Sequence, residues 1–156
     1  MKLKFPLIAA FVAVLSLTAC GGGGGDDSPG GNTSVSSPAT LTKTDNTVGT
    51  GAEAVSRSNV NVTYTLWLYS AAAADHKGTR IESNKFNFTI DVSNVIAGFH
   101  QGVTGMKVGG KRTIEIPSSL GYGAGGNQVI PPNSGLVFEV VLDCVKTSQI
   151  TCPALN

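Results

Sequence analysis

The stretch GYGAGGNQVIPPNS, residues 121–134, decides between two very different folds. Its glycines satisfy the spacing G-x-G-x-x-G, which in dinucleotide-binding proteins lies between a strand and the start of a helix. Here NQVIPPNS follows the glycines, and two consecutive prolines do not sit inside a helix. The glycines therefore predict a turn in which the backbone folds back closely, and the flanking aromatic, aliphatic and Pro-Pro residues indicate the rim of an apolar pocket.

Segments with alternating apolar residues surround this turn. Residues 59–69, 85–91 and 111–116 alternate before it, and residues 135–145 after it carry apolar side chains on both faces, as a central strand does. We expect a mainly antiparallel sheet. Within each strand, one face carries the following side chains: Val60, Val62, Tyr64, Leu66 and Leu68 in the first, Phe86, Phe88 and Ile90 in the second, Ile114 and Ile116 in the third, and Leu136, Phe138, Val140, Leu142 and Cys144 in the last.

One short helix is expected within NVIAGFHQGVTGM, residues 94–106. Asn94 is a candidate N-cap, and Ile96, Phe99 and Val103 follow the spacing of one helix face. The sequence therefore predicts an α+β domain in which one helix covers several antiparallel strands.

The amino-terminal sequence predicts export. MKLK is positively charged, and the apolar run at residues 5–17 is too short for a permanent membrane span, which needs about 20 apolar residues. Residues 17–20, LTAC, resemble the bacterial lipobox, in which the signal is cut before the cysteine and the cysteine carries the lipid. The alternative is an ordinary secretory signal with Cys20 incidental.

On the lipobox resemblance, residues 1–19 are a signal peptide and residues 20–45 a lipidated Cys20 followed by a flexible Gly/Ser/Pro-rich tether. The folded domain is expected at residues 46–147, with a tail at residues 148–156. The expected location is the cell envelope, with the membrane as partner through the lipid. Glycine after Cys20 indicates the outer membrane, facing the periplasm or the surface, if the cell is gram-negative.

The two remaining cysteines, Cys144 and Cys152, form an even pair in a compartment that permits disulfides. We expect a bridge between them in preference to a metal site, because no histidine lies nearby at ligand spacing. A net charge of +1 does not suggest nucleic acid as a partner. No long heptad segment precedes the domain, so a monomer is expected.

Around the glycine turn the sequence resembles the FKBP-type peptidyl-prolyl cis-trans isomerases. The matching motifs are V-I-x-G-[WF]-x-x-G at 95–102, G-M-x-V-G-G-K-R at 105–112, G-Y-G at 121–123, I-P-P-N at 130–133 and L-x-F-x-V at 136–140. The resemblance extends back through VTYTLWL and GTRIESN to VGTGAEA. It implies an antiparallel β-sheet of five to six strands curled around one short α-helix, with a proline-binding pocket between them.

The activity that the resemblance implies is isomerisation of X-Pro bonds in exported proteins, with no cofactor and no metal. The implied partners are unfolded or proline-containing polypeptides, and macrolide inhibitors of the FK506/rapamycin type. Rotation about an X-Pro bond crosses a barrier of about 18–20 kcal/mol that comes from amide resonance. A dry apolar pocket disfavours the planar, more polar amide, so no nucleophile or proton relay is required.

Carried over residue by residue, the resemblance assigns catalytic roles to Tyr64, Glu82, Phe99 and Tyr122. Phe99 would form the pocket floor, where the family usually has tryptophan, and the Ile96 N–H and the Tyr122 hydroxyl would donate to substrate carbonyls. The implied substrate-binding residues are Ile81, Phe86, Val95, Ile96, Ile130 and Phe138. From periodicity alone, the phenylalanines at 86, 88 and 138 are core residues.

Two positions depart from the family pattern. Ile81 stands where phenylalanine is usual, and Glu82 where aspartate is usual. These changes keep open a non-catalytic module or chaperone that binds proline-containing segments. A purely structural envelope lipoprotein is a third possibility. Lys107, Lys111 and Arg112 are interpreted as a solvated rim.

Overall fold

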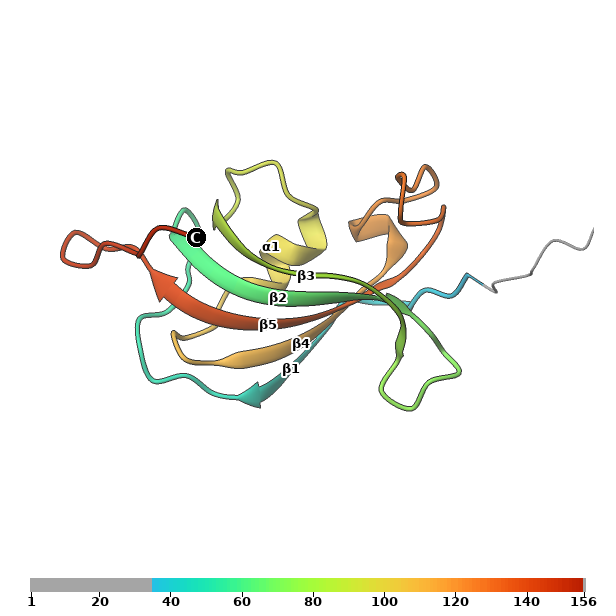
Figure 1. Cartoon of the computed structure of the whole chain (residues 1–156), viewed down its shortest axis with the longest axis horizontal. Coiled ribbons are helices and arrows are strands. Elements are labelled where there is room, and N and C mark those ends of the chain that lie inside the picture. Colours follow the sequence, from blue (N-terminus) through green and yellow to red (C-terminus); the bar gives the residue numbers. More distant parts are fainter. Residues whose placement is uncertain (1–34, 156) are drawn as a thin grey trace, which may run out of the picture. The chain divides into compact units, whose positions relative to one another are not determined.

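The computed structural model describes residues 35–155, which form a five-stranded antiparallel sheet with one α-helix (Figure 1). The elements are β1 (Thr42–Thr47), β2 (Asn59–Tyr69), β3 (Lys77–Thr89), α1 (Ala97–Val103), β4 (Lys111–Ile116), the 3-10 turn η1 (Ser118–Leu120) and β5 (Leu136–Val145). The strand order is β1-β4-β5-β2-β3, so β5 is central. Cys20 and the signal segment lie outside the described residues. No helix among the described residues is long and apolar enough to cross a membrane.

The sheet bends around α1, and the loop between β4 and β5 lies on the same side of the sheet as the helix (Figure 1). Glycines bring α1 close to β4. A Cβ added at Gly102 would lie 2.5 Å from Cδ1 of Ile114, and one at Gly98 would clash with Cγ2 of Ile116. The helix therefore packs at a distance that only glycine permits at these two positions.

The predicted strand faces are confirmed. The alternating residues of β2 and β5 form the core together with Phe99 and Val103 of α1. Val137, on the other face of β5, is also buried, as expected for a central strand. Two predicted inward-facing residues are exceptions. Phe86 is 38% exposed. A register shift in the pairing of β2 with β5 places Cys144 opposite Asn61, so that Val145, opposite Val60, takes the core position.

The predicted N-cap at Asn94 is wrong. The helix begins at Ala97, and its N-cap is Ile96, whose ψ of 140° is extended and whose side chain makes no cap hydrogen bond. The buried His100 instead fixes the turn ahead of the helix. Its Nδ1 accepts a hydrogen bond from the Asp91 N–H at 3.0 Å, and its Nε2 lies 3.0 Å from the Ser93 carbonyl.

The described structure includes residues ahead of 46, within the segment predicted to be tether. β1 pairs with β4, with Thr42 opposite Glu115 and Asp45 opposite Arg112. Every side chain of β1 is exposed. An edge strand that buries neither face has no hydrophobic alternation, and this is why the sequence pattern did not reveal it.

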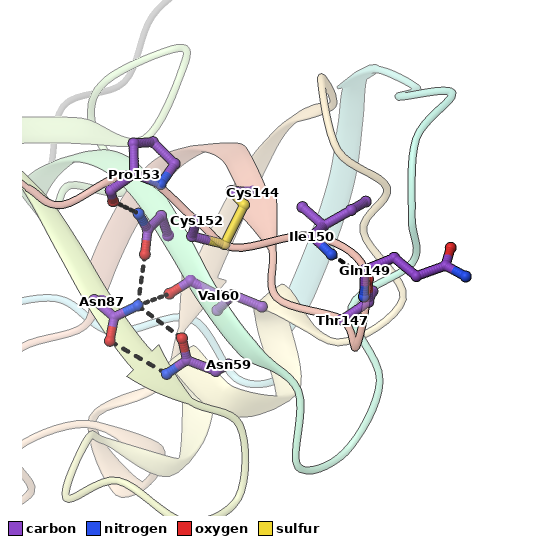
Figure 2. The surroundings of a disulfide bond; sticks show 10 residues. Asn59, Val60, Asn87, Cys144, Thr147, Gln149, Ile150, Cys152 and Pro153 are labelled. Carbon is purple, nitrogen blue, oxygen red and sulfur yellow. Dashed lines mark hydrogen bonds between the residues drawn. A yellow bond between two sulfur atoms is a disulfide. The ribbon is translucent and has the colours of Figure 1, made fainter.

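A disulfide joins Cys144 at the end of β5 to Cys152 in the tail (Figure 2). The tail turns back through a hydrogen bond from the Thr147 N–H to the Ile150 carbonyl. Beyond the disulfide, the amide of Asn61 donates to the Pro153 carbonyl at 2.8 Å. The tail is thus held against the end of the sheet by one covalent bond and by hydrogen bonds.

Candidate functional site

Three aromatic side chains from three different elements meet beside α1. Tyr64 comes from β2, Phe99 from α1 and Phe138 from β5. The ring centroids are 6.0 Å apart for Tyr64 and Phe99, 5.7 Å for Tyr64 and Phe138, and 4.9 Å for Phe99 and Phe138. These distances and the tilted ring planes are those that aromatic pairs prefer. We call these three residues the aromatic cluster.

Two phenylalanines of β3 extend the aromatic cluster towards solvent. Phe88 lies 5.4 Å from Phe99, centroid to centroid, and Phe86 stacks on Phe88 at 5.6 Å. Phe88 is buried, whereas Phe86 is 38% exposed. Of the two, Phe86 therefore borders the surface of the site, a distinction that strand periodicity alone does not make.

The Tyr64 hydroxyl donates a hydrogen bond of 2.7 Å to a carboxylate oxygen of Glu82. Glu82 lies on β3 opposite Leu66, next to an irregularity in the pairing of β2 with β3. Burial raises the pKa of Tyr64 well above its ordinary value, and the hydrogen bond and the charge of Glu82 raise it further. Tyr64 therefore remains a protonated donor at any physiological pH.

Tyr122 lies in the glycine turn and is 39% exposed. Burial raises the pKa of Tyr122, and the charge of the Glu82 carboxylate raises it further. The turn requires its glycines. Gly126 has a φ of +59°, and a Cβ there would lie 2.8 Å from the backbone of Pro131 and Pro132.

The other predicted site residues differ in how accessible they are. Ile81, Val95 and Ile96 are half-buried and pack against the core. Ile130 is 1% exposed, so its side chain lies in the core beneath the turn, whereas the neighbouring Val129 is 64% exposed. The sequence analysis did not single out Val129, although it is the other branched aliphatic residue of the same stretch.

The first turn of α1 offers a hydrogen-bond donor. The Ile96 carbonyl accepts from the N–H groups of Phe99 and His100. Within residues 35–155, the Ile96 N–H itself donates to no other residue. This N–H directly precedes α1, the helix that carries Phe99 of the aromatic cluster.

Arg112 is not part of a solvated rim, whereas Lys107 is exposed and the Lys111 side chain is 43% exposed, as that interpretation expects. Arg112 is 7% exposed and donates from Nη1 to the Gly102 carbonyl at 2.8 Å. Lys111 pairs with Glu139, whose pKa is lowered mainly by its hydrogen bond from Lys77. Arg112 thus joins β4 to α1, and Lys111 joins β4 to β5.

The arrangement combines an apolar aromatic surface with hydrogen-bond donors and has no activated nucleophile. The carboxylate next to the cluster, Glu82, is already bonded to Tyr64. Such a site can orient a polypeptide carbonyl and exclude water from it, and it is poorly suited to proton transfer or covalent catalysis.

Comparison with known proteins agrees with this chemistry. The family described as FKBP-type peptidyl-prolyl cis-trans isomerase matches residues 51–143. An FK506-binding protein of Neisseria meningitidis serogroup B is 44% identical over 95 residues, which cover 60% of this chain and 85% of the relative.

Solved structures, one of them of a peptidyl-prolyl cis-trans isomerase, share the fold. The enzyme from Pseudomonas syringae pv. tomato superposes with a TM-score of 0.58 and 31% identity, covering 69% of this chain and 76% of that one. FkpA from Escherichia coli gives a TM-score of 0.59 and 32% identity, covering 73% of this chain and 52% of that one.

Proposed function

Since the chain belongs to the FKBP-type peptidyl-prolyl cis-trans isomerase family and has that activity, we propose that the aromatic cluster, with Glu82 and Tyr122, is its active site. The observation that carries the proposal is the meeting of Tyr64, Phe99 and Phe138, which Phe88 connects to the exposed ring of Phe86. An apolar surface of this kind suits a proline ring.

The proposed mechanism relies on orientation and dehydration. A twisted X-Pro amide has lost much of the charge separation of the planar form, so an apolar site favours it relative to water. Each ~1.4 kcal/mol of that preference is roughly tenfold in rate. The Ile96 N–H and the Tyr122 hydroxyl would donate to carbonyls of the bound segment and fix the proline ring against Phe99.

Glu82 would act through Tyr64. Its carboxylate accepts from the Tyr64 hydroxyl and so fixes one wall of the aromatic cluster. Ile81, Phe86, Val95 and Phe138 would supply apolar contacts. Because Ile130 is buried, its contribution would be to support the turn that carries Tyr122.

A protease-coupled assay tests the proposal, using a tetrapeptide with an apolar residue before proline. We expect micromolar protein to accelerate isomerisation, and Phe99→Ala to lower kcat/KM at least tenfold while the protein stays folded. Undiminished kcat/KM in Phe99→Ala would place the active site elsewhere.

A binding module on the same fold is the second candidate, and Ile81 and Glu82 motivate it because they depart from the family pattern. It predicts tight binding of proline peptides without acceleration. Absence of acceleration together with retained binding, measured by titration calorimetry, would favour it over catalysis.

We also propose that macrolides of the FK506/rapamycin type bind at the aromatic cluster. The relatives named FK506-binding proteins support this, since they match the segment that contains the cluster. Competition between FK506 and a proline peptide tests it, and simultaneous binding of both would contradict a shared site.

Finally, we propose that the protein is a monomeric lipoprotein of the cell envelope that assists folding of exported proteins. LTAC at residues 17–20 supports lipidation of Cys20. Metabolic labelling with a fatty acid should mark the wild type and not Cys20→Ser, and the variant should leave the membrane fraction. Equal membrane association of the wild type and the variant would contradict the lipid anchor.

The monomeric state is tested separately, by sedimentation of the detergent-solubilised protein.

A further inference from the structure

We propose that Ser37 is a positioning residue for Tyr122, an inference that rests on the role of Tyr122 proposed above. Ser37 belongs to a short segment, residues 35–38, which we call the strap. The strap lies ahead of the residues that match the family, 51–143, and within the segment that the sequence pattern assigned to the tether. It contacts both ends of the loop at residues 117–135, which we call the site loop.

Ser37 holds the first end of the site loop. Its Oγ accepts a hydrogen bond of 2.9 Å from the Ser118 N–H. The Ser118 carbonyl in turn accepts from the N–H of Gly121 at 3.0 Å and from that of Gly123 at 2.8 Å. These two glycines flank Tyr122, so a short chain of hydrogen bonds joins the Ser37 hydroxyl to the backbone on both sides of the tyrosine.

Ser36 holds the second end of the site loop. Its carbonyl accepts from the Gly135 N–H at 2.9 Å, and its Oγ donates to the Tyr69 carbonyl at 3.0 Å. The strap lies directly against Gly135, where a Cβ would be 2.5 Å from Pro38 Cδ and 2.7 Å from Ser37 Cα. The absence of a side chain at this position therefore makes room for the strap.

Consecutive residues of one segment thus fix both ends of the site loop. The loop itself is rich in glycine, and ordering such a segment when substrate binds costs conformational entropy. A loop whose ends are already fixed loses less conformational entropy when substrate binds. Without the Ser37 hydroxyl, the Ser118 N–H loses its partner and the Gly121–Gly123 turn becomes more mobile, so Tyr122 spends less time in the donating position.

The test compares full-length variants in the tetrapeptide isomerase assay. Ser37→Ala should lower kcat/KM about three- to tenfold, the size expected for one lost hydrogen bond. Ser37→Thr keeps a hydroxyl and should restore the wild-type value. Thr40→Ala is the matched control, because the Thr40 side chain is exposed and makes no hydrogen bond within residues 35–155.

A double-mutant cycle separates positioning from general destabilisation. In the Tyr122→Phe background, Ser37→Ala should have no further effect on kcat/KM, because the group that it positions is gone. Amide hydrogen exchange at Gly121 and Gly123 should speed up in Ser37→Ala and not in Thr40→Ala, which reports on the loop without using activity.

The outcomes are distinguishable. Additive effects of Ser37→Ala and Tyr122→Phe, or unchanged kcat/KM and exchange in Ser37→Ala, overturn the positioning role while leaving the proposed active site intact. A wild type without isomerase activity overturns the proposed function and this inference together. Three results together support the inference. Ser37→Ala lowers kcat/KM, Ser37→Thr retains the wild-type value, and Ser37→Ala has no further effect on kcat/KM in the Tyr122→Phe background.

Discussion

At the scale of single residues, the site depends on one hydrogen bond between neighbouring strands. Tyr64 on β2 and Glu82 on β3 are joined at 2.7 Å. An aspartate at position 82 would be one methylene shorter, so it would reach the hydroxyl only if the backbone moved. The structure thus accommodates the departure from the family pattern, since the longer side chain is bonded to its partner.

We expect Glu82→Gln to lower the pKa of Tyr64 while leaving it above its ordinary value of about 10. The reason is that burial is the largest cause of the raised pKa and remains, whereas the charge of Glu82 is removed. The pKa of Tyr122 should fall as well. NMR titration of the ring carbons of the three tyrosines measures both.

Glu115→Gln is the control for this prediction, because Glu115 is bonded to His76 and takes no part in the aromatic cluster. This substitution should leave the pKa values of Tyr64 and Tyr122 unchanged. A pKa of Tyr64 that does not move in Glu82→Gln would mean that the 2.7 Å hydrogen bond is not populated in solution.

At the scale of elements, Arg112 ties β1, β4 and α1 together. Its Nε and Nη2 donate to the two carboxylate oxygens of Asp45 at 2.7 and 3.0 Å, and its Nη1 donates to the carbonyls of Gly102 and Thr104 at the end of α1. Bidentate pairs of this kind are among the stronger charge-assisted hydrogen bonds. The polar edge strand β1 is therefore fixed by a side chain from its neighbour.

The ion pair between Asp45 and Arg112 makes the stability of the fold depend on pH. The hydrogen bond from Arg112 holds the pKa of Asp45 below its ordinary value. The resulting stabilisation is complete above the unfolded-state pKa of about 3.9 and is lost as the pH falls through the lower folded-state pKa. Because Asp45 is 44% exposed, we expect Asp45→Asn to cost about 1 kcal/mol or less at neutral pH.

Urea unfolding across pH checks this expectation. The difference in the free energy of unfolding between wild type and Asp45→Asn should be largest at neutral pH and should close in acid. Asp91→Asn is a suitable control, since the Asp91 side chain accepts no hydrogen bond from residues 35–155. A difference that persists unchanged at low pH would exclude the ionised carboxylate as its cause.

The contact of α1 with β4 gives a second prediction at this scale. Gly98→Ala should destabilise the protein by roughly 1–3 kcal/mol, because the added methyl clashes with Ile116 and forces the helix outward. Since Phe99 follows directly, kcat/KM should fall too. Chemical unfolding measures the first effect and the peptide assay the second.

Gln101→Ala, at an exposed position of the same helix, should be close to neutral and serves as the control. Combining Gly98→Ala with Ile116→Ala should cost less than the two changes added together, because the smaller residue removes the clash. Strict additivity would show that the clash is relieved in some other way.

The elements also show which parts of the fold can be predicted from sequence. The faces of β2 and β5 were predictable because burial of one face imposes alternation. β1 was not, because it buries neither face. The burial of Arg112 was predictable in principle, since it lies on the same face of β4 as Ile114 and Ile116. Its charge alone favours exposure, which is why it was predicted to be solvated. The family resemblance assigned Tyr64 and Glu82 to the site, but their hydrogen bond was not predicted, because local patterns do not reveal contacts between strands.

At the scale of the whole molecule, the described chain is fastened near both of its ends. The strap and β1 attach the amino-terminal side, and the disulfide between Cys144 and Cys152 attaches the tail. The strap contacts the site loop, whereas the disulfide lies at the end of β5. The two attachments should therefore have different consequences, the first for activity and the second for stability alone.

Reducing the disulfide should lower the free energy of unfolding by about 2–3 kcal/mol, the chain-entropy value for so short a loop. Its partners span a sequence separation of 8, and the hydrogen bond from Asn61 to Pro153 depends on the same tail. We expect kcat/KM to stay within about twofold of the oxidised protein. The tail's hydrogen bonds within residues 35–155 do not involve the aromatic cluster, and the effect is too small to unfold a typical domain. Urea unfolding with and without reductant measures the loss. Cys144→Ala/Cys152→Ala should be insensitive to reductant, and two reactive thiols from these residues in the native oxidised protein would refute the bridge.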